Sequence, residues 1–245
     1  MTTSPSFLEK QQEQLLNKDY DVRISNLAAF IHHKINKIPG KILDIGVGNA
    51  LLIKYFNNQG YKTSGIELSQ RLINDYKKQK ALRGINFKKG DITKLQGDAE
   101  YDYVLCCDVL EHIKDDKKAI KNLWSFVKIG GVLIISVPAH PHLFGERDKM
   151  LGHHRRYNKQ QLINLTSNLN SYKISMLTYW NIFGYFPYYF FEKILHKKIN
   201  DNFRYKKGLI NKITVTIIDL LFKLEAKLPK IPIGLSLVIV IKKIK

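Results

Sequence analysis

The chain has 245 residues, of which 44% are hydrophobic, and its 40 Lys/Arg against 21 Asp/Glu give a formal net charge of +19. This is the composition of an ordinary globular chain that buries a full core, and we expect one domain with elaborations. The two cysteines, Cys106 and Cys107, are adjacent in an apolar run, which excludes a disulfide framework between distant segments. The polar, partly acidic N-terminus lacks the basic patch and apolar run of a signal peptide, so we expect a cytoplasmic protein.

The positive charge is uneven along the chain. Residues 193–245 contain thirteen Lys/Arg and three acidic residues, which is more than half of the net excess. A surface of this kind attracts polyanions such as anionic lipid, nucleic acid or a phosphorylated substrate. The last fifth of the chain is therefore a candidate surface for a partner.

In chain order, residues 7–36 have the apolar spacing of one or two helices that cover a sheet, and Pro39 and Gly40 end them. Residues 41–45 read as a buried strand that runs into a glycine turn, Gly46 and Gly48, and then into a helix starting near Ala50. Such a turn lets backbone N–H groups touch a ligand, although the same pattern also suits an ordinary strand-to-helix connection.

The remaining elements alternate between strand and helix. We predict strands at 63–66, 86–89, 101–107, 132–137, 172–179 and 235–241, and helices at 70–80, 115–127, 158–168 and 209–228. This alternation predicts a doubly wound α/β fold whose ligand lies at the carboxyl ends of parallel strands. Glycines and acids mark those ends: Gly46, Glu67, Asp91 and Asp108.

Glu67 ends the second strand about 20 residues after the glycine turn, where a carboxylate accepts both hydroxyls of a ribose. This position favours a nucleoside cofactor over a plain turn. We divide the single domain 1–245 into an N-terminal helical cover (1–40), a cofactor-binding core (41–180), a basic, aromatic insertion (181–232) and the final strand (233–245).

Five motifs, in order, carry a family resemblance: LDIGVGNA, GIELS, GDI, DYVLCCDVLEHI and GGVLIISVPA. Together they resemble class I S-adenosylmethionine-dependent methyltransferases over residues 41–165 plus the final strand. The later HHRRYNKQQL and PIGLSLVIVIKK are similar to the methyltransferase domain type 11 or 12 subgroup. The resemblance implies a Rossmann-like, seven-stranded, mostly parallel sheet with the last strand antiparallel.

The resemblance also implies roles in binding S-adenosylmethionine. Asp44, Gly46 and Gly48 face the methionine part of the cofactor, and Glu67 takes the ribose hydroxyls. Ala50 departs from the family pattern, which has a third glycine there, and we expect alanine to be tolerated because the residue is already helical.

Further along, the resemblance implies that Leu68 packs on the adenine and that Asp91, with Ile92 alongside, accepts from its amino group. The segment of Cys107 and Asp108 closes over the methionine part. Arg23 either reaches the cofactor carboxylate or lies on a solvated helix face.

Methyl transfer from a sulfonium needs the acceptor in line, water excluded and, for a hydroxyl acceptor, a base. We predict Glu111, His112 and His153 as the catalytic residues. The candidates for the base lie on two connections: Asp108, Glu111, His112, His140, His142, His153 and His154.

The spacing D-x-x-E-H also allows a metal site. It is similar to the E-x-x-E-H…H site of small-RNA 2′-O-methyltransferases and to the related site of ubiquinone-pathway O-methyltransferases. In this alternative Asp108, Glu111, His112 and His153 hold a divalent ion such as Mg²⁺, which lowers the pKa of the acceptor oxygen. In the other, Glu111 and His112 form a structural or acid/base pair without metal.

Arg155, Arg156 and Tyr157 form a cationic fork that suits a phosphate or carboxylate on the acceptor, and we predict that they bind substrate. The alternative is that an arginine pairs with a structural acid, Asp148 or Glu146.

The aromatic stretch 179–195 is too short and too interrupted to span a bilayer. With its flanking lysines and the basic amphipathic helix that follows, it suits an anionic membrane surface, or else it caps the active site or a dimer interface.

The sequence thus predicts an S-adenosylmethionine-dependent O-methyltransferase with a small or lipid-linked acceptor, such as a quinone precursor or a polyprenyl-linked sugar. We expect peripheral membrane association at most. One alternative is an RNA methyltransferase, favoured by the charge and disfavoured by the lack of a nucleic-acid-binding module. Another is a protein that binds the cofactor or a membrane without turnover.

Overall fold

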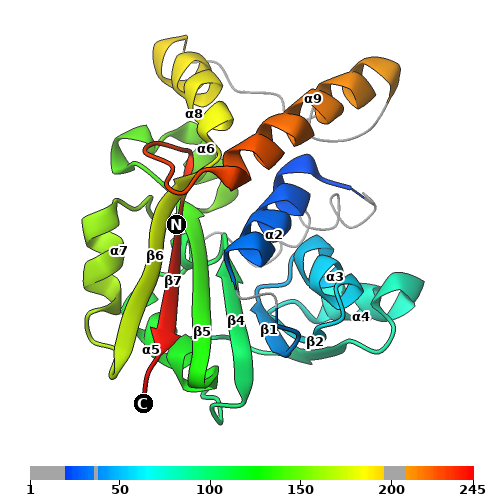
Figure 1. Ribbon diagram of the computed structural model, residues 1–245, viewed down its shortest axis with the longest axis vertical. Coiled ribbons are helices and arrows are strands. Elements are labelled where there is room, and N and C mark those ends of the chain that lie inside the picture. The colour runs from blue at the N-terminus through cyan, green and yellow to red at the C-terminus, as the bar shows by residue number, and fades with distance from the viewer. Residues whose placement is uncertain (1–19, 36–37, 196–207) are drawn as a thin grey trace.

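The computed structural model describes residues 20–35, 38–195 and 208–245, with side chains in the last range from residue 212 onward. These residues form one sheet with helices packed on both of its faces (Figure 1). The predicted three-layer α/β architecture is confirmed.

The sheet contains seven strands in the order β3-β2-β1-β4-β5-β7-β6. The strands are β1 (Lys41–Ile45), β2 (Lys62–Glu67), β3 (Asn86–Lys89), β4 (Tyr101–Cys107), β5 (Val127–Pro138), β6 (Tyr172–Trp180) and β7 (Ser236–Lys243). The first five strands pair in parallel, and β7 is antiparallel to both of its neighbours, β5 and β6. The expectation of a mostly parallel sheet with an antiparallel last strand is correct.

Helices connect the strands and cover the sheet. They are α2 (Val22–Lys34), α3 (Leu51–Asn58), α4 (Gln70–Lys78), α5 (Asp116–Phe126), α6 (Glu146–Leu151), α7 (Lys159–Thr166), α8 (Ile182–Tyr188) and α9 (Gly208–Lys227). Short turns of 3₁₀-helix occur at η1 (Lys80–Leu82), η2 (Leu110–His112) and η3 (Pro141–Leu143), and η4 (Tyr189–Ile194) is a π-helical extension of α8.

Alternate residues of the central strands supply two separate cores. Val104 and Cys106 of β4 pack against α5 and α7 on one face, whereas Tyr103 and Leu105 pack against α2, α3 and α9 on the other. This alternation explains why β4 reads as a continuous apolar run: both of its faces are buried. Cys106 is fully buried, as expected of a small core residue.

The predicted N-terminal helices are only partly inside the described residues, because residues 1–19 lie outside them. From residue 20 onward the prediction holds: Asp21 accepts hydrogen bonds from the backbone N–H groups of Arg23 and Ile24 and so caps α2. Ser69 likewise caps α4 by accepting from the Leu72 N–H group. The helix α6 lies between the predicted strand 132–137 and the predicted helix 158–168, where no helix was predicted.

The order of the strands indicates at which edge of the sheet a ligand binds. The sheet grows in one direction from β1 to β2 and in the other from β1 to β4, so the connections that leave these strands diverge to opposite faces. Ligands of such sheets bind in the crevice beyond the carboxyl ends of the strands at this point. The residues that follow β1, β2 and β4 therefore form the candidate site.

Candidate functional site

The turn after β1 is a tight backbone corner. Gly46 has φ +74° and donates its N–H group to the Ile66 carbonyl at 2.8 Å. A Cβ atom added to Gly46 would lie 2.5 Å from a methyl group of Val109, which follows β4. Only glycine satisfies both the left-handed conformation and this close approach.

Glu67 is held at the end of β2 by the backbone of two turns. One carboxylate oxygen accepts from the Gly48 N–H group at 3.1 Å and the other from the Ser69 N–H group at 3.1 Å. Each oxygen keeps further lone pairs, because a carboxylate can accept about four hydrogen bonds. The side chain is thus fixed in position while it retains the capacity to accept from two ligand hydroxyls.

Asp44 lies beneath the turn with little exposure, and burial, together with the nearby charge of Glu67, raises the pKa of its carboxyl to about 7. Its Oδ2 atom is buried and has no hydrogen-bond partner within the described residues. Such an oxygen is costly unless a ligand supplies a donor. The carbonyl of Gly48 is fixed by the Tyr76 hydroxyl, which donates to it at 2.6 Å.

Ala50 corrects one expectation. The residue is not helical: it is left-handed, with φ 59°, and precedes α3. An L-residue adopts this conformation at a cost of roughly 1–2 kcal/mol, which explains the glycine that the family pattern has here. The Ala50 methyl group is buried against Val47 and Ile53, and this packing offsets part of the cost.

The residues predicted to hold an adenine lie farther along the same edge. Leu68 is 54% exposed directly after Glu67. Asp91 accepts from both the N–H group and the hydroxyl of Thr93; although partial burial acts to raise its pKa, these bonds hold it below the usual value. Ile92 is buried in the core and supports this loop from below.

Asp108 follows β4 with a left-handed backbone, φ 56°. Its carboxylate forms an ion pair with Arg23 of α2, and both side chains are about one-quarter exposed. Arg23 is therefore neither on a solvated face nor free. Asp108 directly follows Cys107, the half-buried last residue of β4, and the role of this segment in binding the methionine part stays a prediction.

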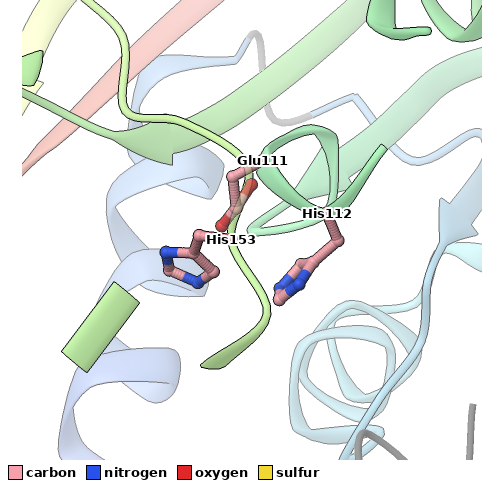
Figure 2. A group of neighbouring side chains, drawn as sticks. All are labelled: Glu111, His112 and His153. Carbon is pink, nitrogen blue, oxygen red and sulfur yellow. The ribbon is translucent and has the colours of Figure 1, made fainter. Parts of the chain in front are cut away.

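Three of the four predicted metal or catalytic residues meet in space. Figure 2 shows Glu111 and His112 leaving η2 and pointing toward His153, on the chain that follows α6. One potential ligand atom from each of these residues lies within 4.8 Å of the others. Asp108 is not a member of this cluster, because its left-handed backbone and Arg23 place its carboxylate elsewhere.

The cluster contains two unsatisfied polar atoms. Glu111 Oε2 and His112 Nδ1 are buried without a hydrogen-bond partner among the described residues. Burial, with the charge of Asp108, raises the pKa of Glu111 well above its usual value. Burial, with nearby His153, lowers the pKa of His112 to about 4, so its imidazole is neutral at pH 7.

His153 is oriented by a buried acid. Its Nδ1 atom lies 2.8 Å from Asp148 Oδ1, and Asp148 is fully buried. Although burial acts to raise the pKa of Asp148, its bonds with His153 and Arg156 hold it below the usual value. The Asp148 carboxylate therefore fixes the His153 proton on Nδ1 and leaves Nε2 as the basic nitrogen.

The predicted substrate fork is mostly internal. Arg156 is buried and pairs with Asp148 at 2.9 Å, which is the alternative that the sequence left open. Tyr157 is buried too, with its hydroxyl 2.9 Å from Asp116, so neither side chain has surface left for a substrate. Arg155 pairs with Asp116 but is one-third exposed, and its role in binding substrate stays a prediction.

The other loop histidines do not join the cluster. His140 stacks on Tyr179 with ring centroids 4.9 Å apart and contacts His142, and the His154 N–H group donates to the Glu111 carbonyl at 2.7 Å. Sequence reasoning did not find Tyr76, Val109 or Tyr188. Their contacts join residues that are distant in the chain, and no local pattern marks them.

Comparison with known proteins agrees with this geometry. Residues 43–135 match a family model described as a methyltransferase domain. The ubiquinone biosynthesis O-methyltransferase of Coxiella burnetii is 32% identical over 111 residues, which are 44% of this chain and 47% of that protein. The chain spans about half the length of the curated relatives it matches.

Solved structures show the same fold. The 1,6-didemethyltoxoflavin-N1-methyltransferase of Burkholderia thailandensis, solved with S-adenosylhomocysteine, has a TM-score of 0.57 at 14% identity and covers 98% of this chain and 85% of its own. The [4+2]-cyclase SpnF has a TM-score of 0.56 at 17% identity, covering 91% and 81%. The fold is thus that of S-adenosylmethionine-dependent methyltransferases, a fold that also hosts a cyclase.

Proposed function

We infer that this chain, whose residues 43–135 match a methyltransferase-domain model, uses S-adenosylmethionine to transfer a methyl group to a hydroxyl oxygen. The proposal rests on two groups of residues that lie next to each other at one edge of the sheet. We call the first group the donor half-site and the second group the acceptor half-site. The turn after β1 and the end of β2 suit a nucleoside donor, and a cluster of bases follows β4.

The residues of the first half-site fit S-adenosylmethionine. When bound, this cofactor supplies an electrophilic methyl group on its sulfonium. Glu67 offers free lone pairs to two ribose hydroxyls, Asp44 has a buried oxygen in need of a donor, and Leu68 exposes an apolar side chain to a flat ring. Gly46 and Gly48 keep side chains away from the methionine end.

The second half-site supplies the base that an oxygen acceptor needs. His153 Nε2 carries the lone pair because Asp148 holds the proton on Nδ1, and His112 Nδ1 is neutral and unpaired. His153 Nε2 can take the proton of the acceptor hydroxyl as the oxygen attacks, whereas His112, with its pKa lowered to about 4, is the weaker base. A positioned base of this kind contributes roughly 10²–10⁴-fold to the rate.

The acceptor that we propose is small or lipid-linked, of the quinone-precursor or polyprenyl-linked sugar type. The names of the relatives support the quinone precursor. A phenolic hydroxyl of such an acceptor is acidic enough for a histidine to deprotonate as the bond forms. A lipid-linked acceptor also requires the chain to work beside a membrane, which we include in the proposal.

A divalent cation is the second candidate for this half-site. Glu111, His112 and His153 offer one oxygen and two nitrogens within 4.8 Å, and Glu111 and His112 each have a buried polar atom without a partner among the described residues. A cation held there would stabilise an ionised acceptor oxygen. Metal analysis of the purified protein, with activity measured after excess EDTA, separates the two: full activity in EDTA leaves the histidines as the base, and loss restored by Mg²⁺ assigns the cation.

The test of the proposal is product formation from catechol, phenol and polyprenyl-linked acceptors, followed by mass spectrometry and by release of S-adenosylhomocysteine. We expect a methylated product from at least one acceptor. His153→Ala should slow it by about 100-fold or more while S-adenosylhomocysteine still binds. Cofactor binding without turnover of any acceptor would favour a non-catalytic protein, and turnover of RNA alone would overturn the acceptor.

A further inference from the structure

The segment from α8 to α9 carries most of the exposed large apolar side chains of the described residues. Twelve of the seventeen that are at least about one-third exposed belong to it: Phe183, Phe186, Tyr189, Phe190, Phe191, Ile194, Leu195, Ile213, Ile217, Leu220, Leu224 and Leu228. We call these twelve residues the α8–α9 surface. Isolated exposed apolar residues are normal, but a concentration on two neighbouring helices marks an interaction site.

The helix α9 has two apolar faces with different uses. Val215 and Phe222 are buried against the core, where the Phe222 ring stacks on Trp180 with centroids 4.9 Å apart. Ile217 and Leu220, on the other face, are 55% and 58% exposed. One face is therefore enough to attach the helix, and the second contributes nothing to the folded chain that the structure describes.

The helix α8 is attached in a similar way. Glu225 of α9 is buried and accepts from the backbone N–H groups of Asn181 and Ile182, which fixes the start of α8. Tyr188 is buried beside Arg156. The phenylalanines of α8 and η4 lie outside these anchors and project from a firmly held helix.

The charge around the α8–α9 surface is positive. Lys212, Lys227 and Lys230, on α9 and directly after it, are exposed. The acids of α9 are engaged internally: Glu225 is buried, and Asp219 accepts from Asn26 at 2.9 Å. Exposed apolar side chains together with exposed lysines on one helix are the pattern of a protein that lies on anionic lipid.

We propose that the α8–α9 surface docks on an anionic lipid bilayer, with its phenylalanines and leucines among the acyl chains nearest the headgroups and its lysines on lipid phosphates. Among the described residues, none of the helices is both long enough and apolar enough to cross a bilayer, so docking is peripheral. The net positive charge disfavours a second copy of this surface as the occupant, because two such surfaces repel.

Docking on this surface brings the bilayer to the end of the molecule that holds the site. Ser136 and Pro138 of β5 pair with β7 beside the end of β6, and α8 begins directly after β6, so the helix rises from the carboxyl edge (Figure 1). On the inner side of α8, Tyr188 contacts Arg156 at 2.7 Å, next to the Asp148 that orients His153. A lipid-linked acceptor would then reach the cluster of Glu111, His112 and His153 from the bilayer past α8. This step rests on the proposed function.

The test is co-sedimentation of the full chain with vesicles of phosphatidylglycerol and phosphatidylcholine, against vesicles of phosphatidylcholine alone. We expect binding to the anionic vesicles that falls steeply with salt. Ile217→Glu should weaken it by at least about tenfold, because it places a charge in the docked face. The matched control is Ile129→Glu, at an isoleucine that is 67% exposed near the start of β5, at the end of the sheet opposite to α8, and this variant should bind like the parent chain.

Three results would overturn the docking: no binding of the parent chain at low salt, equal loss in both variants, or a dimer in size-exclusion chromatography that Ile217→Glu dissociates. Titration of S-adenosylhomocysteine into the same variants keeps the two proposals apart. If a chain binds S-adenosylhomocysteine but not vesicles, only the membrane docking is refuted. If it binds vesicles but not S-adenosylhomocysteine, only the proposed methyl transfer is refuted.

Discussion

The carboxylate of Glu67 provides the sharpest perturbation of the donor half-site. Glu67→Gln preserves the size of the side chain and one acceptor oxygen, which can keep the bond from the Gly48 or the Ser69 N–H group. It removes the charge and turns the other oxygen into an NH₂ donor. That donor faces a backbone N–H group on one side and, in the complex that we propose, a ribose hydroxyl on the other.

The expected loss follows from the bonds at stake. A hydrogen bond to a charged group contributes roughly 1.5–3 kcal/mol, and a neutral one about 1 kcal/mol. Two ribose hydroxyls that lose a charged acceptor therefore cost about 1.5–3 kcal/mol in total. Since about 1.4 kcal/mol changes an equilibrium constant tenfold, the Kd for S-adenosylhomocysteine should rise by roughly 10- to 100-fold.

Isothermal titration calorimetry measures this Kd directly. The matched control is Glu100→Gln, which removes an exposed carboxylate paired with Lys41 at the other edge of the sheet and should leave the Kd unchanged. Circular dichroism confirms that both variants are folded. A Kd for Glu67→Gln within twofold of the parent chain would refute the assignment of Glu67 to the ribose.

Three further predictions concern stability and positioning. In urea titrations, Gly46→Ala should lower the free energy of unfolding by about 1–3 kcal/mol more than Gly60→Ala does. Both glycines are left-handed, but only Gly46 has a neighbour, Val109, where a Cβ atom would lie. Equal losses in the two variants would refute the close approach. Burial raises the pKa of Glu225 to about 7 from 4.5. As pH rises from about 4.5 to 7, the free energy of unfolding of the parent chain should therefore fall by up to about 3 kcal/mol relative to that of Glu225→Gln. A difference between the two chains that is constant with pH would contradict this. Tyr188→Phe should cost about 1 kcal/mol of stability through its lost bond, and no change in thermal unfolding would argue against that contact.

Much of the donor half-site could be predicted because its signals are local. The strand 41–45 was predicted with the bounds that β1 has, since a buried apolar run ends there in glycine. Glu67 and Asp91 were placed at strand ends by the same alternation of strand and helix. Local geometry set the limit: the left-handed Ala50 could not be distinguished from a helical alanine, because the sequence does not reveal a backbone angle.

The acceptor half-site was predictable only in part because its contacts are long-range. The spacing of Glu111 and His112 suggested a shared cluster with His153, and the structure brings these three together. It separates Asp108, whose partner Arg23 lies 85 residues earlier in the chain. The buried pair of Asp148 and Arg156 was left open by the sequence, since any of several acids could have met the arginine.

The short helix α6 was missed for a related reason. It has six residues, too few to display an apolar period, and it is capped by Asp148, which accepts from the Gly145 N–H group at 3.0 Å. The same carboxylate orients His153. One buried acid therefore connects the fold of the loop with the chemistry of the cluster, a connection that spacing alone does not reveal.

We propose that a nucleoside methyl donor binds at the turn after β1 and the end of β2. A crystal structure of the chain with S-adenosylhomocysteine tests it most directly. We predict the ribose hydroxyls on Glu67, the adenine beside Leu68 and Asp91, and the sulfur facing the cluster of His112 and His153. Density for the ligand at another edge of the sheet, or none at saturating concentration, would contradict the account.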